Sequence, residues 1–153
     1  MTEENLVSIT FRILDIKVEK FTLSPPEKLN IPELGTEFTF NISTTFELNP
    51  KEKTLVWEIF GEIFLEPEKI NFCGDIKVSY AYKIENFEEV ASVHDGKVTI
   101  KDAVLNVLLQ ISLDTTRGIL IEKTSGTNLQ RAYFPIISTK RIIEQIKKNI
   151  ANS

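Results

Sequence analysis

The change of hydrophobic period along the chain constrains its fold most. Up to about residue 84, large apolar residues alternate with polar ones, as in strands that are half-buried on one face. After residue 100 the period lengthens, and Val104, Leu105 and Leu108 follow the i, i+1, i+4 spacing of an amphipathic helix. Strands followed by helices predict an α+β fold. We expect one domain over residues 1–153, with a four-stranded antiparallel sheet followed by two helices packed on it.

Three of the expected strands have clear limits. The first runs from Val7 to Phe21 and changes its apolar phase at Leu14, which is typical of a β-bulge. Ser24-Pro25-Pro26 ends it, because proline cannot donate to the ladder. The third and fourth strands are expected from about Thr54 to Leu65 and from about Asp75 to Ile84.

The second expected strand has the cleanest alternation. One of its faces carries Phe38, Phe40, Ile42, Thr44, Phe46 and Leu48. The third strand also carries apolar residues on both faces, with Val56, Phe60 and Phe64 opposite the face of Trp57. Two helices do not cover all of this surface, and a contiguous exposed apolar area usually marks an interface. Burial between subunits of an oligomer explains the surface equally well.

The segment from Glu85 to Thr99 has no strong period but contains the turn signal Asp95-Gly96. The long helix is expected to continue to a C-cap at Ser125-Gly126. Gly118 lies inside it, and a glycine there predicts a kink or a close helix contact.

Charge is distributed unevenly along the chain. The net charge is −4, but the final predicted helix, Lys140 to Ala151, carries +3 and the remainder therefore −7. Ser138 or Thr139 caps this helix. An acidic body argues against nucleic-acid binding, which needs clustered cations. The basic helix either steers a charged partner or is a solvated face with cations near its C-terminal end.

Cys73 is the only cysteine, so no intrachain disulfide forms and a reducing compartment fits. The N-terminus, Met-Thr-Glu-Glu-Asn, is polar and lacks the regions of a signal peptide. No apolar run approaches the roughly 20 residues that span a bilayer. These features predict a cytoplasmic protein that does not insert into membranes.

Candidate catalytic groups are few. His94 has no second histidine or cysteine at zinc-site spacing, and nothing places it beside Cys73 as a base. Glu58 and Glu62 are about 13 Å apart along a strand, too far for a carboxylate pair. Asp114 to Arg117 suggests an ion pair on the helix or a subunit contact. We expect no enzyme, cofactor or metal site.

The order of elements resembles the SecB-like chaperone family over about Val7 to Ala151. The residues that carry the resemblance are the slipped first strand ending in Ser24-Pro25-Pro26, then Thr116-Arg117-Gly118 on the long helix, then Leu129 to Pro135 before the terminal helix. The resemblance implies a dimer of dimers, a homotetramer, with subunit contacts on the first strand and the long helix. It implies an ATP-independent holdase that binds unfolded polypeptide clients in apolar grooves, as in protein export.

The resemblance also implies site residues. The groove would have its floor on the second strand, with walls from the crossover after the fourth strand and from the terminal helix. Its residues would be Leu34, Phe38, Phe40, Ile42, Phe87, Val90, Ile142, Ile143 and Ile146. Export-type members dock the translocase motor on an acidic outer sheet face, where this chain has Glu58 and Glu62, and Arg117 would contact another subunit. Some relatives instead protect a labile antitoxin, and that role is equally open.

Overall fold

The computed structural model describes residues 8–24, 38–65 and 71–151. Four strands form an antiparallel sheet in the order β1-β4-β3-β2: β1 (Phe11–Leu23), β2 (Phe38–Asn49), β3 (Thr54–Leu65) and β4 (Asn71–Ile84). The remaining elements are α1 (Phe87–Val90), β5 (Ala91–His94), β6 (Lys97–Ile100), α2 (Asp102–Thr124) and α3 (Thr139–Ala151). The α+β fold with a four-stranded antiparallel sheet and two long helices is therefore confirmed.

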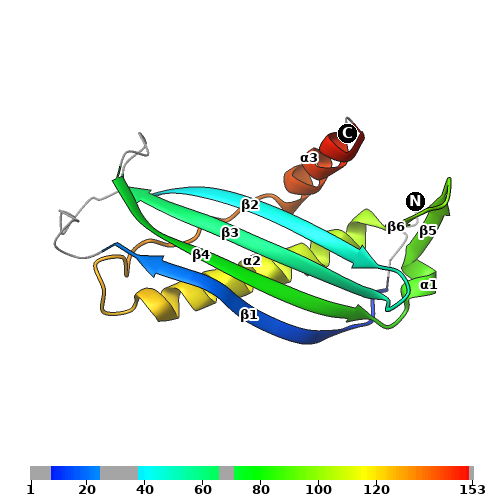
Figure 1. Ribbon diagram of the computed structural model, residues 1–153, viewed down its shortest axis with the longest axis horizontal. Coiled ribbons are helices and arrows are strands. Elements are labelled where there is room, and N and C mark those ends of the chain that lie inside the picture. Colours follow the sequence, from blue (N-terminus) through cyan, green and yellow to red (C-terminus); the bar gives the residue numbers. More distant parts are fainter. Residues whose placement is uncertain (1–7, 25–37, 66–70, 152–153) are drawn as a thin grey trace, which may run out of the picture.

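The core lies between α2 and the two central strands. Trp57 and Ile59 on β3, and Val78 and Tyr80 on β4, are fully buried on the sheet face that α2 crosses (Figure 1). The i, i+3, i+4 positions of α2 supply the opposing surface, including Leu108. By length and composition α2 could also cross a membrane. We interpret it as a core helix, because this apolar face packs on the sheet.

Two buried tyrosines bind α2 to the sheet. The hydroxyl of Tyr80 lies 2.6 Å from Oγ1 of Thr116, and the hydroxyl of Tyr82 lies 2.7 Å from Oγ of Ser112. The hydroxyls of Ser112 and Thr116 on the buried face of α2 are thus satisfied, as buried hydroxyls require. Burial raises the pKa of Tyr80 to about 12, because the neutral phenol is favoured there.

The edge strand β1 has two irregularities in its pairing with β4. The register shifts between Ile13 and Asp15, which confirms the bulge predicted at Leu14, and again between Val18 and Lys20. The second shift is not evident in the sequence pattern. The strand ends at Leu23, directly before the predicted stop.

The segment expected to lack periodicity forms a helical turn, α1, and a hairpin of β5 and β6. Asp95 and Gly96 have φ of 50° and 74°, which is the backbone of a type I′ hairpin turn, so the turn prediction is confirmed. Gly126 has φ of 75° beyond the end of α2, consistent with the predicted C-cap. Of the two alternatives predicted for Gly118, a kink or a close helix contact, the close contact is not found within the described chain, because a Cβ there would meet no described atom within 4 Å.

Candidate functional site

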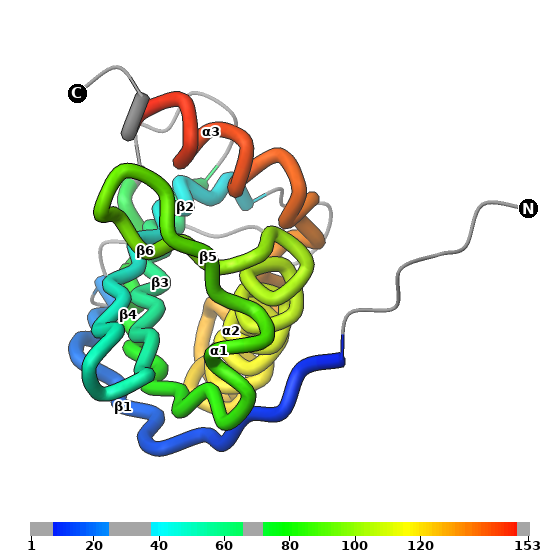
Figure 2. Tube along the Cα trace, turned by 90° about the vertical axis from the view of Figure 1, so that its right-hand side faces the viewer, coloured from blue at the N-terminus to red at the C-terminus, as the bar shows by residue number. Residues whose placement is uncertain are grey.

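An apolar groove with a volume of about 560 Å³ opens between α3, the hairpin and the second half of β2. Figure 2 shows α3 above β2, with the hairpin beside it at one end of the molecule. The groove is lined by Thr44, Thr45, Phe46, Leu48, Lys97, Val98, Thr99, Ile100, Leu105, Ile143, Ile146, Lys147 and Asn149. Its volume is in the range of ligand-binding pockets, roughly 300–1,000 Å³.

The floor of the groove is the part of β2 from Thr44 to Leu48. Phe46 is half-buried, and its ring centroid lies 4.9 Å from that of the fully buried Trp57 on β3. Because Trp57 belongs to the core and is the cross-strand neighbour of Phe46, it supports the Phe46 ring from the side. The floor is therefore an aromatic surface that keeps one side toward the groove.

One wall of the groove is α3. Ile143 is buried and anchors the helix, whereas Ile146, one turn further, is half-buried and lines the groove. Lys147 donates to Oδ2 of Asp102 at 2.7 Å and so joins α3 to the start of α2. Both side chains are more than half exposed, and such pairs contribute at most about 1 kcal/mol. The helix is thus held mainly by its apolar face.

The other wall comes from the hairpin and the start of α2. Val98 and Ile100 on β6 line the groove together with Leu105 of α2. A backbone hydrogen bond of 3.0 Å from the Lys101 N–H to the Val90 carbonyl closes the base of the hairpin. Consequently the hairpin is fixed at its base, beside the groove.

The first half of β2 is covered instead. Residues 125–138, which join α2 to α3 and which we call the covering segment, place Phe134 on this part of the sheet. The Phe134 ring packs edge-on against Phe40, with centroids 5.6 Å apart, and is almost fully buried. A Cβ added at Gly61 on β3 would lie 2.8 Å from the same ring, so no larger residue fits without displacing it.

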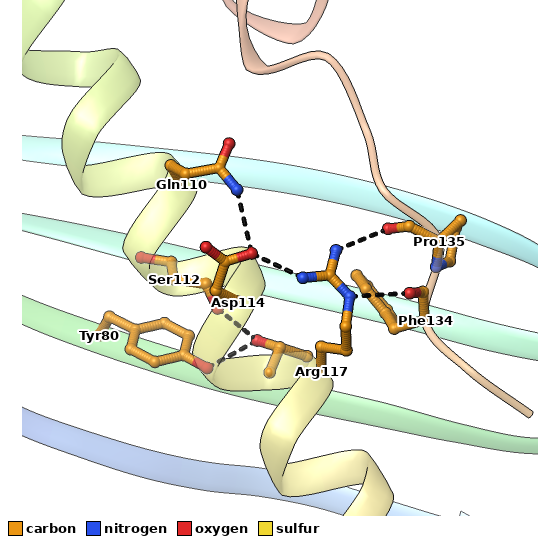
Figure 3. Close-up of polar contacts among 8 residues, drawn as sticks. Tyr80, Gln110, Ser112, Asp114, Arg117, Phe134 and Pro135 are labelled. Carbon is orange, nitrogen blue, oxygen red and sulfur yellow. Dashed lines mark hydrogen bonds and ion pairs between the residues drawn. The ribbon is translucent and has the colours of Figure 1, made fainter.

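Arg117 holds the covering segment in place (Figure 3). Its Nε donates to the Phe134 carbonyl and its Nη2 to the Pro135 carbonyl, each at 2.9 Å. Nη1 lies 2.6 Å from Oδ1 of Asp114, so the ion pair predicted from the sequence is confirmed. Hydrogen bonds from Gln110 and from Arg117 hold the pKa of Asp114 below its usual value.

The residues predicted for the groove are distributed differently among these surfaces. Ile143 and Ile146 line the groove. The others within the described ranges do not line it: Phe38, Phe40, Ile42 and Ile142 are half-buried against the core, and Phe87 and Val90 are buried in it. Leu34 lies outside the described residues. This groove involves β2 and α3, and it lies further along β2 than the predicted floor; a peptide-binding role for the predicted residues stays a prediction.

Sequence reasoning missed the groove residues Phe46, Leu48, Val98, Ile100 and Leu105. Phe46 and Leu48 share a face with the predicted floor residues but lie nearer the end of the strand. A signal for the hairpin wall exists in the turn dipeptide at residues 95–96, which alternating apolar residues follow.

The two predicted docking carboxylates lie on the sheet face away from α2. Glu58 is half-buried, lies 3.4 Å from Nζ of Lys77 and accepts a hydrogen bond of 3.5 Å from Thr45. Glu62 is also half-buried and is paired in register with Asn41 and Asp75. A docking role for these two residues stays a prediction.

The candidate reactive groups lie apart. Cys73 is fully buried, and burial raises the pKa of its thiol, as expected for a structural cysteine. His94 is exposed at the hairpin turn. Across residues 8–24, 38–65 and 71–151, no group of three or more His, Cys, Asp or Glu side chains is placed to hold a metal ion.

The arrangement of sheet, helices and groove defines a SecB-like fold, as the sequence resemblance predicted. Neither the family models nor the curated proteins contain a match to this chain. Among solved structures, the chain is similar to the Rv1957 SecB-like chaperone of Mycobacterium tuberculosis, solved in complex with a ChAD peptide from the Rv1956 HigA1 antitoxin. The TM-score is 0.56 over 84% of this chain and 90% of that chain, at 12% identity, so the likeness concerns the fold.

Proposed function

We propose that this protein is an ATP-independent chaperone that holds apolar segments of unfolded polypeptides in the groove. The observation that carries the proposal is the open apolar groove over the supported Phe46 ring. A further support is that the structurally similar mycobacterial protein was solved with a peptide bound. The role needs no catalytic group and no cofactor.

The physical basis of such binding is burial of apolar side chains. Each Å² of apolar surface removed from water contributes roughly 25 cal/mol, whatever the order of residues in the client. A groove of about 560 Å³ accommodates only a short part of a client. Several grooves acting on one chain would raise the overall affinity, because the later binding events are intramolecular.

A homotetramer would supply those additional grooves. Exposed apolar side chains lie on the edge strand β1 and on the outer side of α2, and they fit a subunit interface better than contact with water. They are Ile13, Leu14, Ile16, Val18, Val107 and Ile121. Light scattering measures the solution mass, and a monomer would contradict the extended multi-groove surface.

The second candidate function is that of a dedicated chaperone for a single antitoxin. It is favoured by the antitoxin peptide bound to the mycobacterial protein. Co-purification of this protein with one stable partner from its own cells would support the dedicated role, whereas a broad set of clients would support general holding. Protein export, with motor docking at Glu58 and Glu62, is a further use of general holding. Binding of the purified motor, lost when both are changed to Lys, would support it.

Suppression of aggregation tests the holding function directly. A chemically denatured model protein is diluted into the chaperone without nucleotide, and light scattering follows its aggregation. We expect suppression near stoichiometric ratio, strongly reduced by Ile146→Asp, which places a carboxylate in the groove. The matched control is Ile136→Asp, because Ile136 is 91% exposed and does not line the groove.

Circular dichroism is needed to show that both variants remain folded. Absence of suppression by the unmodified protein, even at excess, would refute the holding function. Equal loss in the two variants would show that binding does not use this groove.

A further inference from the structure

We propose that the groove selects apolar segments flanked by acidic residues, an inference that rests on the proposed peptide-binding function. Among the residues that the structure describes, the charged side chains that line the groove are Lys97 and Lys147, and no carboxylate lines it. They lie on opposite sides, Lys97 on the hairpin and Lys147 on α3. A segment lying on the floor therefore meets a lysine side chain at each rim.

The two lysines differ in how far their charge is compensated. Lys147 is paired with Asp102, so its charge is largely neutralised. Lys97 is exposed and has no salt-bridge partner within the part of the chain that the structure describes. Lys97 is consequently the rim cation available to a bound carboxylate.

The wall helix adds a wider positive field. Residues 140–151 carry a net charge of +3 in a chain whose net charge is −4. Figure 2 shows that α3 lies directly over β2, so this charge is concentrated beside the groove. The rest of the chain is acidic and repels an acidic client, which directs an acidic segment toward this side of the molecule.

The floor and the rim then have separate roles. Apolar contacts on the floor provide affinity with little selectivity. Charges at the rim discriminate between clients, because a basic flank is repelled and an acidic flank attracted. Screening limits this discrimination to roughly 8 Å at physiological salt, so the acidic residues must lie within a few positions of the apolar ones. The expected occupant is an extended segment with two or three large apolar residues bordered by Asp or Glu.

A set of three peptides tests the selection on the full chain. They share one apolar core and differ only in flanks of Asp, Ser or Lys, and fluorescence anisotropy of a common label reports their binding. We expect the Asp-flanked peptide to bind about tenfold more tightly than the Lys-flanked one at low salt, with the difference shrinking at 0.5 M salt, roughly a 4 Å screening length.

Lys97→Glu is expected to reduce or reverse the preference. Lys17→Glu is the matched control, since it makes the same change in net charge on the opposite edge strand. Its side chain is exposed and paired only with Glu19 on the same strand among the described residues. The preference should survive in this variant.

The outcomes separate the inference from the function on which it rests. Equal binding of the three peptides, or equal effects of the two lysine variants, would overturn the charge selection. The proposed function would then still stand if the Ser-flanked peptide binds and Ile146→Asp abolishes its binding. Failure of every peptide to bind would overturn both.

Discussion

The two halves of β2 have the same residue pattern but different surroundings. In both halves aromatic and aliphatic residues alternate with polar ones, and Phe40 and Phe46 occupy equivalent positions on one face. Phe40 lies beneath the covering segment, whereas Phe46 is the floor of an open groove. Both rings are half-buried, so the difference between the halves lies in the segments packed against them and not in the strand itself.

The covers also differ in how they are held. The covering segment is fixed by a buried ring and by two hydrogen bonds from one guanidinium. The helix above the other half is held by a buried isoleucine, adjoining apolar contacts and one solvent-exposed ion pair. The firmly held covering segment and the less firmly held α3 lie next to each other along β2. The groove therefore ends where the covering segment begins.

Removing the Phe134 ring from the covering segment should have the largest effect on stability. Phe134→Ala is expected to lower the free energy of unfolding by about 3–5 kcal/mol, because it leaves a cavity over Gly61. Phe46→Ala removes the same atoms from a half-buried site and should cost less than half as much while weakening peptide binding more. Chemical denaturation measures the first quantity and anisotropy the second. Similar losses of unfolding free energy in the two variants would contradict the proposed difference in packing between the two halves of β2.

Removing the guanidinium should have the next largest effect. Arg117→Met leaves the carbonyls of Phe134 and Pro135 without these donors and should lower the free energy of unfolding by about 2–3 kcal/mol. Arg117→Lys should recover only part of this, since a single ammonium cannot reproduce the planar fork. The control is Arg141→Met on the exposed face of α3, expected within about 0.5 kcal/mol. If Arg117→Met left the free energy of unfolding unchanged, the covering segment would not depend on the guanidinium for its position.

Thiol chemistry can compare the groove with the buried interior of the sheet in solution. Cys73 is buried near the start of β4, and a thiol reagent should modify it at least about tenfold more slowly than a cysteine introduced at Thr44 in a Cys73→Ser background. Burial raises the pKa of Cys73, so its reactive thiolate forms only at higher pH, and its rate should keep rising after that of the groove thiol has levelled. Comparable rates and pH profiles would mean that the sheet also opens around Cys73.

The smallest effect concerns the ion pair that joins α3 to α2. Lys147→Met and Asp102→Asn should each change the free energy of unfolding by less than about 1 kcal/mol, with coupling in a double-mutant cycle below the same limit. A larger coupling would show that the groove wall depends on this pair. The difference in how firmly the covering segment and α3 are held would then be smaller than proposed.

Much of this fold is evident in the sequence, because its elements have clear periods. The alternation from Thr54 to Leu65 gives both the strand and its buried face. The phase change at Leu14 locates a bulge, and the Asp95-Gly96 pair locates a hairpin turn. These signals are local, so a single chain displays them without reference to its three-dimensional neighbours.

The position of the groove could not be predicted in the same way. It depends on where Phe134 lies, and that placement needs the absence of a side chain at Gly61, 73 positions earlier, together with the reach of Arg117. Contacts between distant segments leave no periodic mark. The four-residue strands of the hairpin are likewise too short to show a period. The family resemblance places this wall at Phe87 and Val90 instead.

The close approach of Gly61 and Phe134 means that these two positions share one volume. A bulkier residue at one requires a smaller residue at the other, so we expect relatives of this chain to exchange them together. A relative with a smaller residue in place of Phe134 would have a longer groove along β2, with β2 itself unchanged. The length of client segment that the groove binds could then change in evolution through this single pair of positions.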